Sequence, residues 1–501
     1  MIRYGGSTLR KWSVIGIVVL VLIGVFFLIV RNVEFDSKRI NVSLSNIDTK
    51  GLQQVISHSN LGETVVLNGS QVVSDTILID KSNITIDGLQ KDGSLSKLKT
   101  NTAIPIFKIK EGVSSVTIKN IILEGNLERE NPKVYTKEVG INITGNTSNI
   151  TLSNLQLDNF SGYGVYANLT KNLKINKTKI TNFGYAGIMG FSVRNVEITN
   201  CAIGGALSYN LSSIGNHKIA YNVAFTRKSD DDIHKYPRSK NCIVKNSVIM
   251  DNTFWEGLDT HGGEDIQFIN NTIKNVKVPI AAVPSEVNGE DKYAPKDIKI
   301  SNNIIEAPSN ELSNSVNRGV ILSGTMKKSS DADPKKEYAT GVIQNNIISG
   351  YGRRDAYSQG KLLATGSIFL QSTKGAKVLG NEIYHSYYYG ILAYYDNKDF
   401  KFDHNKISGL HVVLNGEIFP HPAGIGVLSS KNKGQINQND IRGNLEDPML
   451  EIRGIDIISK IDINVIAKGN KFDKYIKTPY NQMKYDKDEK QYQSTYLDKG
   501  E

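Results

Sequence analysis

Cysteine is nearly absent from this chain, which has two in 501 residues, Cys201 and Cys242. Two cysteines exclude a disulfide-stapled scaffold, because such folds depend on several bridges. One bridge between Cys201 and Cys242 and two free thiols are both open alternatives.

Clusters of Lys and Arg are also missing. The formal charge is +10 and the pI is about 9.1, yet the basic residues are scattered along the chain. A nucleic-acid-binding arm would concentrate them, so we expect no nucleic-acid partner. A net positive charge instead favours an acidic polymer, such as a uronate-containing polysaccharide, as the partner.

One long uncharged run stands near the N-terminus. Trp12 to Val30 is nineteen residues, and at about 1.5 Å per residue a helix of that length spans roughly 28 Å, close to the hydrocarbon thickness of a bilayer. No small-residue cleavage site follows it. We predict a cytoplasmic tail (1–11), a single-pass signal anchor (12–30) and a linker (31–46). A large domain (47–475) and a polar tail (476–501) would then lie outside the cell membrane.

A short repeat fills the large domain. The pattern apolar-x-apolar-x-Asn recurs, and its shortest intervals are 22 to 25 residues. Helical periodicity and a leucine framework are both absent, which excludes a leucine-rich repeat. Strands of alternating apolar and polar residues that recur at this interval predict an all-β parallel β-helix. The Asn marker stands at positions 120, 154, 176, 200, 246, 271, 303, 346, 381, 405, 439 and 470.

The Asn marker and the N-terminal end of the repeat have predicted structural roles. Asparagine tolerates left-handed backbone at turns and can form amide ladders between coils. A short helix over about Lys50–His58, capped by Asp48 or Thr49, would cover the open end of the solenoid.

A second strand follows each Asn by about eleven residues, and it aligns a column of branched aliphatic residues. Since side chains alternate along a strand, this column faces the core and its neighbours face outward. Asp259 and His261, which flank Thr260, would therefore both face solvent, about 6.6 Å apart. The column comprises Val165, Ile188, Leu258, Ile280, Ile391 and Ile425.

Long insertions gather around Asp259 and His261. They cover roughly 208–241, 284–297, 325–338 and 351–361. Functional residues concentrate where loops surround a rigid scaffold, and a walled groove suits a polymer. A β-helix that tolerates insertions anywhere is the alternative explanation.

Asp259 and His261 are the central candidates for catalysis. An outward Asp-x-His can be a general base with its partner, half of a metal site, or ordinary surface polarity. Trp255 could stack on a sugar ring or fill a corner of the core. Glu256 and Asp259, three positions apart on an extended strand, should face opposite sides, so we do not expect them to form a glycosidase pair.

Other candidates are weaker, because each alone is common on protein surfaces. Arg227, Lys228, Lys277 and Arg318 could neutralise a uronate carboxylate. Tyr394, in the predicted column of His261, could extend a sugar-binding surface. Asp230, Asp231 and Asp232 could bind Ca²⁺, although an acidic loop between basic residues is usually just solvated.

The repeat and the capping helix resemble the pectate-lyase-like superfamily of right-handed parallel β-helix proteins, over roughly residues 47–475. The run Gly257-Leu258-Asp259-Thr260-His261 is similar to the Gly-x-Asp-Pro-His run of mannuronan C5-epimerases and related alginate lyases. In that family the Asp and the His belong to the active site, with a Tyr three residues before the Asp. Here Glu256 stands in place of the Tyr, and Thr260 in place of the Pro. Galacturonan hydrolases are less similar, because no Asn-Thr-Asp and no Gly-His-Gly run occurs.

This resemblance implies an enzyme that removes the C5 proton of a uronate, as a lyase or a C5-epimerase. His261 would be the base, and Asp259 would orient it or, when protonated, bond the substrate carboxylate. Arg227 or Lys228 would supply positive charge, and Tyr236 a proton. Trp255, Glu256, Lys277, Arg318 and Tyr394 would bind substrate. The alternatives are a glycoside hydrolase on the same fold and a non-catalytic surface protein that binds polysaccharide.

Overall fold

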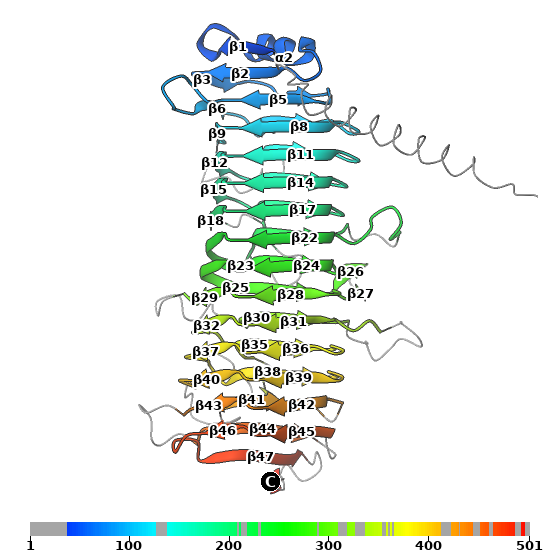
Figure 1. Ribbon diagram of the computed structural model, residues 1–501, viewed down its shortest axis with the longest axis vertical. Helices are drawn as coiled ribbons and strands as arrows, with labels where there is room; N and C mark the ends of the chain where they lie inside the picture. Colours follow the sequence, from blue (N-terminus) through cyan, green and yellow to red (C-terminus); the bar gives the residue numbers. More distant parts are fainter. Residues whose placement is uncertain are drawn as a thin grey trace, which may run out of the picture.

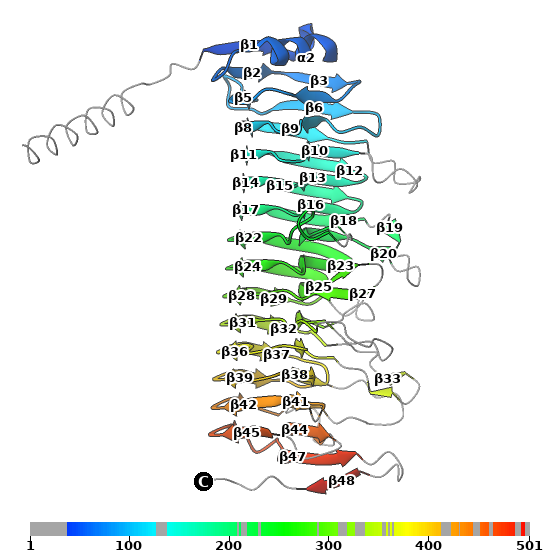
Figure 2. The ribbon, with the colours of Figure 1, turned by 90° about the vertical axis from the view of Figure 1, so that its right-hand side faces the viewer.

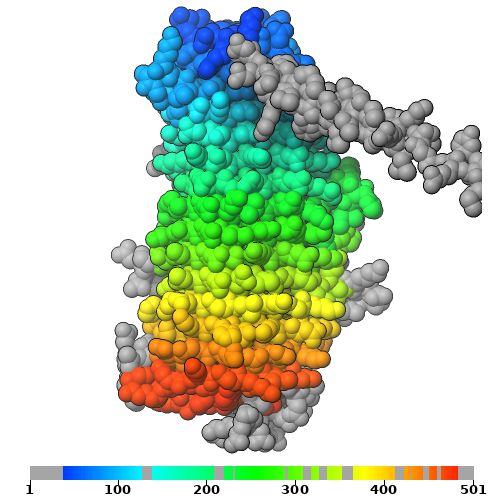
Figure 3. Space-filling model, viewed as in Figure 1, coloured from blue at the N-terminus to red at the C-terminus, as the bar shows by residue number. Residues whose placement is uncertain are grey.

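The computed structural model describes residues 38–495, except 127–137, 208–209, 212–217, 229–231, 288–289, 309–317, 326–335, 353–356, 359–360, 363–364, 412–421, 430, 444–450, 460–463 and 486–491. Strands stack coil upon coil into one long column (Figures 1 and 2), whose successive coils form consecutive bands on the surface (Figure 3). The predicted signal anchor at 12–30 lies outside the described residues. Within the described part of the chain, no helix is long and apolar enough to cross a membrane.

The column has three parallel ladders, which confirms the predicted parallel β-helix. The first ladder is a 15-stranded sheet. Its strands, in order, are β1 (Arg39–Ser43), β2 (Thr64–Asn68), β5 (Ile84–Asp87), β8 (Ser114–Lys119), β11 (Ser148–Ser153), β14 (Lys171–Asn176), β17 (Arg194–Thr199), β22 (Lys240–Lys245), β24 (Glu264–Ile269), β28 (Ile298–Ser301), β31 (Gly341–Gln344), β36 (Lys377–Leu379), β39 (Phe400–Asp403), β42 (Lys433–Asn437) and β45 (Asn464–Lys468).

The second and third ladders meet in two long strands, β23 (Val248–His261) and β25 (Thr272–Val283), which belong to both. The rest of the second ladder is β3 (Ser70–Val73), β6 (Ser96–Thr100), β9 (Ile121–Glu124), β12 (Gln156–Phe160), β15 (Lys179–Phe183), β18 (Ala202–Ala206), β29 (Ile304–Glu306), β32 (Ile347–Ser349), β37 (Glu382–Tyr384), β40 (Lys406–Ser408), β43 (Asp440–Ile441) and β46 (Lys471–Phe472).

The third ladder carries the candidate site. Apart from β23 and β25 it consists of β4 (Ile77–Ile79), β7 (Phe107–Ile109), β10 (Val139–Ile143), β13 (Tyr163–Asn168), β16 (Ala186–Phe191), β21 (Tyr221–Thr226), β30 (Val320–Ser323), β35 (Ile368–Gln371), β38 (Tyr389–Tyr395), β41 (Ala423–Val427), β44 (Arg453–Ser459) and β47 (Thr478–Tyr485). Since β1 and β47 pair with their neighbours, the stack extends past the predicted limits of 47 and 475 on both sides.

Short hairpins and helices complete the fold. The 3-10 helix η1 (Leu44–Asn46) and the helix α2 (Thr49–His58) follow β1, and β48 (Tyr492–Thr495) pairs antiparallel with β47. The hairpins are β19 (Asn210–Leu211) with β20 (Lys218–Ile219), β26 (Ser285–Val287) with β27 (Glu290–Tyr293), and β33 (Tyr357–Ser358) with β34 (Lys361–Leu362).

Helix α2 covers the N-terminal end of the column, as predicted (Figure 1). Asp48 is its N-cap, and the Asp48 carboxylate accepts a hydrogen bond from the Gly51 N–H at 2.7 Å. Leu52 and Ile56 are buried against the first coils. The apolar face of the helix therefore closes a core that would otherwise meet water.

One continuous apolar core runs inside the coils. The predicted aliphatic column is confirmed, because Val165, Ile188, Leu258, Ile280, Ile391 and Ile425 are all buried. Strand pairing adds Val223, Val320, Ile368 and Ile455 to the same column. Burying each such side chain stabilises the fold by about 1.5–3 kcal/mol.

A buried asparagine ladder supports the second half of the column. Each amide nitrogen from Asn271 to Asn439 donates to the Oδ1 of the Asn in the next coil, at 2.9–3.1 Å. The members are Asn271, Asn303, Asn346, Asn381, Asn405, Asn439 and Asn470. The predicted amide ladder is thus confirmed for this half of the chain.

In the first half of the chain the Asn marker occupies a different, adjacent column, and the predicted left-handed turns are confirmed there. Asn120, Asn154, Asn200 and Asn246 occupy these turns, with φ of 50° to 58°, and the Asn154 amide donates to the Asn120 Oδ1 at 2.8 Å. The ladder position is the residue that follows each turn, and Cys201 and Ser247 occupy it before Asn271. Spacing alone does not separate two adjacent columns that both favour asparagine.

Replacing Asn381 with alanine is expected to destabilise the fold by about 1–3 kcal/mol, because it removes the Oδ1 that accepts from the buried Asn346 backbone N–H and the Nδ2 that bonds the next coil. A lower midpoint of thermal unfolding would show this. The control Gln435→Ala, at an exposed amide in β42, should leave the midpoint nearly unchanged. Equal midpoints for the two variants would contradict the role of the ladder.

Cys201 and Cys242 are buried free thiols in the structure. Of the two alternatives left open by the sequence, the structure therefore shows the unbridged one.

Candidate functional site

The geometry of the site begins with a corner in β23 at Gly257. A Cβ added to Gly257 would meet the Pro279 carbonyl oxygen at 2.7 Å, Val276 at 3.1 Å and Ile249 at 3.4 Å. Val276 and Ile249 belong to the core. Gly257 and Leu258 therefore both face inward, and the strict alternation of an extended strand is broken.

As a result, Glu256 and Asp259 lie on the same outer face. The expectation that they face opposite sides was wrong, because it assumed alternation through Gly257. The same corner recurs at Gly164, Gly187, Gly390 and Gly424, where an added Cβ would meet Ile180, Ile203, Ile407 and Ile441 respectively. These glycines, each directly before the aliphatic column, were the signal in the sequence that could have corrected the prediction.

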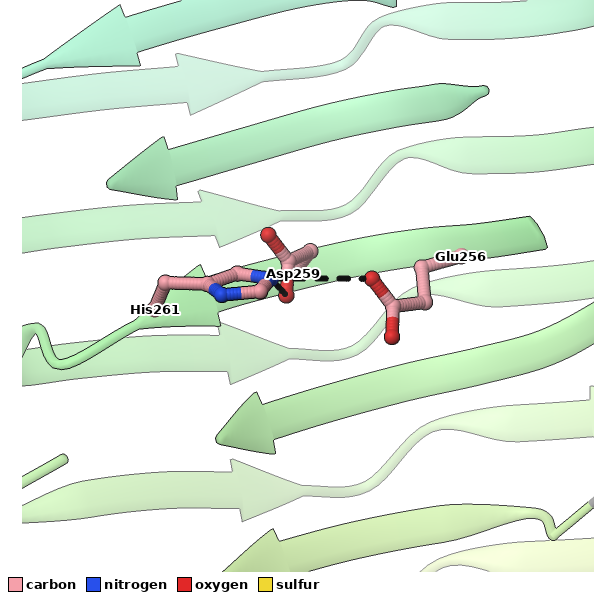
Figure 4. A group of neighbouring side chains, drawn as sticks. All are labelled: Glu256, Asp259 and His261. Carbon is pink, nitrogen blue, oxygen red and sulfur yellow. Dashed lines mark ion pairs between the residues drawn. The ribbon is translucent and has the colours of Figure 1, made fainter. Parts of the chain in front are cut away.

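Glu256, Asp259 and His261 form a compact trio on the outer face of β23 (Figure 4). The His261 Nε2 lies 3.4 Å from the Asp259 Oδ1 and 3.9 Å from the Glu256 Oε2. The Asp259 side chain is 1% exposed and that of Glu256 is 7% exposed, whereas 30% of His261 is open to solvent. His261 is therefore the member of the trio best placed to meet a ligand, through the part of its ring that lies away from the buried Nε2.

Burial and charge shift the protonation of the trio. Burial raises the pKa of Asp259 well above its ordinary value; His261 opposes this rise and Glu256 adds to it. Burial lowers the pKa of His261, but Asp259, Glu256 and the hairpin residue Glu286 outweigh it and raise the pKa to about 9. The trio therefore retains a proton at neutral pH.

The trio also has polar atoms that lack hydrogen-bond partners within the described residues. These atoms are the Glu256 Oε2, both Asp259 carboxylate oxygens and the His261 Nε2. One ligand atom from each residue lies within 4.8 Å of the other two, so the group could accept a metal ion as well as protons. Buried polar atoms without partners are costly, and they mark the trio as a site for a proton, an ion or a ligand.

Trp255 and Lys277 contact each other at backbone positions next to Glu256 and its partner in the following coil. The Lys277 Nζ is 5.7 Å from the centroid of the Trp255 ring. Trp255 directly precedes Glu256, and Lys277 precedes Val278, the residue that pairs with Glu256 in the next coil. The aromatic ring and the cation therefore pair with each other across two neighbouring coils.

Arg227, Lys228 and Tyr236 lie together just beyond the end of β21. The Arg227 side chain is buried, donates to the Tyr236 carbonyl at 2.9 Å and packs over the Tyr293 ring at 4.7 Å. Lys228 is exposed and lies 4.7 Å from the centroid of the Tyr236 ring. Arg227 thus contributes to packing of the loop, whereas Lys228 presents its charge to solvent.

Arg318 and Tyr394 lie farther along the third ladder. The Arg318 guanidinium packs over Phe369 at 4.0 Å, and the Tyr394 ring is 5.7 Å from the same ring. The prediction that Tyr394 occupies the column of His261 was wrong. A register shift after Leu370 pairs Gln371 with Tyr395 instead, so Tyr394 is the extra residue of a bulge.

The predicted calcium ligands are only partly described. Asp230 and Asp231 lie outside the described residues. The Asp232 carboxylate accepts the backbone N–H groups of His234 and Lys235 at 2.9 and 3.0 Å. At Asp232 these bonds stabilise a turn.

Sequence reasoning missed Tyr221. It pairs with Glu256 from the preceding coil, and its ring centroid is 6.5 Å from that of His261. Burial, followed by the charge of Glu256, raises the pKa of Tyr221 well above its ordinary value, so its hydroxyl keeps its proton. Tyr221 is 35 positions before Glu256, and only strand register brings the two together.

Comparison with known proteins supports the fold. A family model described as a right-handed β-helix region matches residues 139–305. An exopolygalacturonase of family 28 from Yersinia enterocolitica has a TM-score of 0.55 at 10% identity, over 78% of each chain. The catalytic unit of a GH87 α-1,3-glucanase from Streptomyces thermodiastaticus has a TM-score of 0.53 at 11% identity, over 86% of this chain and 68% of that one.

A third solved structure, the A-module of a mannuronan C-5 epimerase from Azotobacter vinelandii, has a TM-score of 0.46 at 14% identity, over 69% of this chain and 95% of that one. No curated protein matches the sequence. The family model and the first two structures confirm the predicted right-handed parallel β-helix fold.

Proposed function

We propose that the chain, which has a right-handed parallel β-helix fold, is a polysaccharide-cleaving enzyme, specifically a glycoside hydrolase. The observation that carries this proposal is the shared outer face of Glu256, Asp259 and His261. Glu256 and Asp259 were not expected to form a glycosidase pair because they should have faced opposite sides, and their shared face removes that objection.

His261 is the proton donor in the proposed reaction. It is the exposed member of the trio, and its pKa of about 9 keeps it protonated at neutral pH. Protonation of the glycosidic oxygen by His261 allows the leaving sugar to depart. The buried Asp259, 3.4 Å away, raises the pKa of His261 and so keeps the imidazole protonated before the step.

Glu256 has the complementary role. Glycosidic cleavage develops positive charge at the anomeric carbon, and a nearby carboxylate stabilises that charge. Water then adds to the anomeric carbon and transfers a proton to Glu256. The proton returns from Glu256 to His261 through one bridging water, because the 3.9 Å separation of His261 Nε2 and Glu256 Oε2 exceeds a direct hydrogen bond.

C5-proton abstraction from a uronate is the second candidate. The Asp259–His261 pair and the nearby cation Lys277 favour it, because a lyase or a C5-epimerase needs a base and positive charge near the carboxylate. It requires His261 in its unprotonated form, which a pKa of about 9 disfavours at neutral pH. For this reason we place it second.

The products distinguish these reactions. A hydrolase forms new reducing ends without absorbance from unsaturated sugars, and a lyase forms both. An epimerase exchanges the C5 hydrogen with deuterated solvent and forms neither. Incubation of the full chain with a panel of neutral and acidic polysaccharides would separate the three, and polymer binding without any product would favour a non-catalytic role.

The pH dependence provides an independent prediction. If His261 acts as an acid, kcat/KM should be flat from neutral pH to about pH 9 and fall about tenfold per pH unit above it, because the donor loses its proton. A rise toward pH 9 would instead indicate a base. Asp259→Asn should move the inflection to lower pH, because Asp259 is the largest influence that raises the pKa of His261.

We also propose that the apolar run 12–30 anchors the enzyme in the cell membrane with the β-helix outside. The uncharged length of that run supports this arrangement. Partition of the full chain into the membrane fraction, and its release on deletion of residues 1–30, would test it.

A further inference from the structure

The corner between the third and the first ladder carries a group of lysines and tyrosines, which we call the lysine–tyrosine cluster: Lys336, Tyr338, Tyr395, Lys398 and Lys431. Tyr395 ends β38, which lies toward the C-terminal end of the column from β23 (Figure 1). The Lys336 Nζ lies 5.1 Å from the centroid of the Tyr338 ring and 5.4 Å from that of Tyr395. The Lys398 Nζ is 4.8 Å from the Tyr338 centroid, and the Lys431 Nζ is 5.1 Å from the Tyr395 centroid. The two rings thus connect three ammonium groups.

Asp396 is the acid built into this cluster. It follows Tyr395 in a left-handed turn, with φ of 52°, and its side chain is buried. Asp396 forms an ion pair with Lys336 and accepts a hydrogen bond from the Tyr338 hydroxyl at 3.2 Å. One carboxylate therefore positions a lysine and a tyrosine that stand 60 and 58 residues before it in the chain, and Lys336 neutralises it.

Lys398 and Lys431 are exposed, and the polar partners that they have in the cluster are hydroxyl groups. The Lys431 Nζ donates to the Tyr395 hydroxyl at 2.8 Å. A hydrogen bond with Tyr338 raises the pKa of Lys398, and the one with Tyr395 raises the pKa of Lys431, so both stay charged. A hydroxyl takes one of the three N–H donors of an ammonium and does not neutralise its charge. Both lysines therefore retain charge and donors for a ligand.

The surrounding side chains leave this positive charge in excess. Asp399 is a further acid that acts on Lys398, and it is exposed. Lys374, which pairs with Lys398 from the preceding coil, is also exposed and offsets it. Among the described residues of this corner, the cluster and Lys374 thus bring more cations together than Asp396 and Asp399 neutralise.

Arg238, on the same corner nearer to the trio, has a different role. It lies over the Tyr293 ring at 5.1 Å, pairs with Glu337 at 2.5 Å and donates to the Gly262 carbonyl at 2.8 Å. Its side chain is only 10% exposed. The charge of Arg238 therefore holds loops together, whereas the two outer lysines of the cluster face solvent.

The cluster shares a column with the trio. His261 pairs with Val283, and extending the pairing of β25 with β30 by one residue continues the column through Ser323 and Gln371 to Tyr395. Four inter-strand steps of about 4.8 Å separate His261 from Tyr395, or about 19 Å. The three side chains between them are uncharged. A polysaccharide that lies at the trio and follows this column would therefore reach the cluster.

We propose that the lysine–tyrosine cluster is a second binding site, for an anionic saccharide whose carboxylate or sulfate group contacts Lys398 and Lys431. The excess of exposed positive charge favours an anion as the ligand. The column shared with His261 favours a sugar polymer over other polyanions. Only this choice of a sugar polymer rests on the proposed function, because the charge of the cluster does not depend on catalysis.

Binding of three polymers to the full chain with His261→Ala, which prevents turnover in the proposed mechanism, tests the inference. Polygalacturonate carries carboxylates, dextran sulfate carries sulfates and dextran is uncharged. At least one anionic polymer should bind more tightly than dextran, and the tighter of the two identifies the preferred anion. Adding Lys398→Gln and Lys431→Gln together should weaken that binding roughly three- to thirtyfold, as expected for two exposed ion pairs.

The matched control is Lys179→Gln with Lys471→Gln, which removes the same charge from two exposed lysines of the second ladder. It should leave binding nearly unchanged, and both double variants should unfold at the same temperature as their parent. Equal binding of all three polymers, or equal binding by the two double variants, would overturn the inference.

Single-stranded DNA separates a saccharide site from a general polyanion site. Tighter binding of this DNA than of either anionic polysaccharide would overturn the choice of a saccharide. None of these measurements requires catalysis. If the wild-type protein cleaves no polysaccharide but still binds an anionic one through Lys398 and Lys431, the proposed function is wrong and the second site stands.

Discussion

Replacing His261 with alanine is expected to lower kcat/KM by about 10²- to 10⁴-fold, the range that a positioned general acid contributes. The reason is the position of the imidazole. It is the exposed member of the trio, and the two acids, Glu256 and Asp259, are buried. The measurement is the rate of reducing-end formation on whichever polysaccharide the wild-type protein cleaves.

The matched control is His58→Ala, an exposed histidine in the last turn of α2. It should keep wild-type activity. If His261→Ala also keeps it, the trio is not the catalytic centre, and the non-catalytic alternative becomes the better explanation of the fold.

Replacing Gly257 with alanine is expected to destabilise the protein by about 1–3 kcal/mol and to reduce activity by about 100-fold. The added Cβ would lie 2.7 Å from the Pro279 carbonyl oxygen, which belongs to the backbone of the next coil and cannot rotate away. The corner must then shift, and Glu256 moves relative to Asp259. Thermal unfolding and kcat/KM, measured on the same preparation, check both effects.

Gly145→Ala provides the control for glycine replacement as such. A Cβ at Gly145 would meet only the Glu111 side chain at 3.4 Å, which is ordinary contact. A Gly257→Ala variant as stable and active as Gly145→Ala would mean that the corner tolerates a side chain and does not determine the geometry of the site.

Much of the fold could be predicted from the sequence because repetition makes weak signals additive. The alternation of one strand is ambiguous, but the aliphatic column from Val165 to Ile425 recurs in many coils, and the structure confirms it. Asp48 as N-cap was predictable from local chemistry alone. Asp259 and His261 on an outer face also followed from their neighbours in sequence.

The remaining features of the site depend on departures from regularity. Glu256 joins Asp259 because two consecutive residues turn inward at Gly257, and Tyr394 leaves its predicted column because of a bulge after Leu370. The approach of Tyr221 to Glu256 depends on how a long insertion is accommodated between β18 and β21. The repeat interval in the sequence does not reveal the corner, the bulge or the path of the insertion.

The corner glycine has a consequence for how a reactive centre can arise or disappear in such a protein. Every coil with this corner presents the same two outward positions, three residues apart, on an unaltered backbone. Near the C-terminal end those positions hold Arg453 and Asp456, joined at 3.1 Å, with Asn481 in the next coil bonded to the same carboxylate. There an arginine neutralises the acid, whereas at Glu256 and Asp259 two acids face each other beside a histidine. A reactive centre could therefore arise or disappear through substitutions at two outward positions of one coil, with no insertion and no new fold.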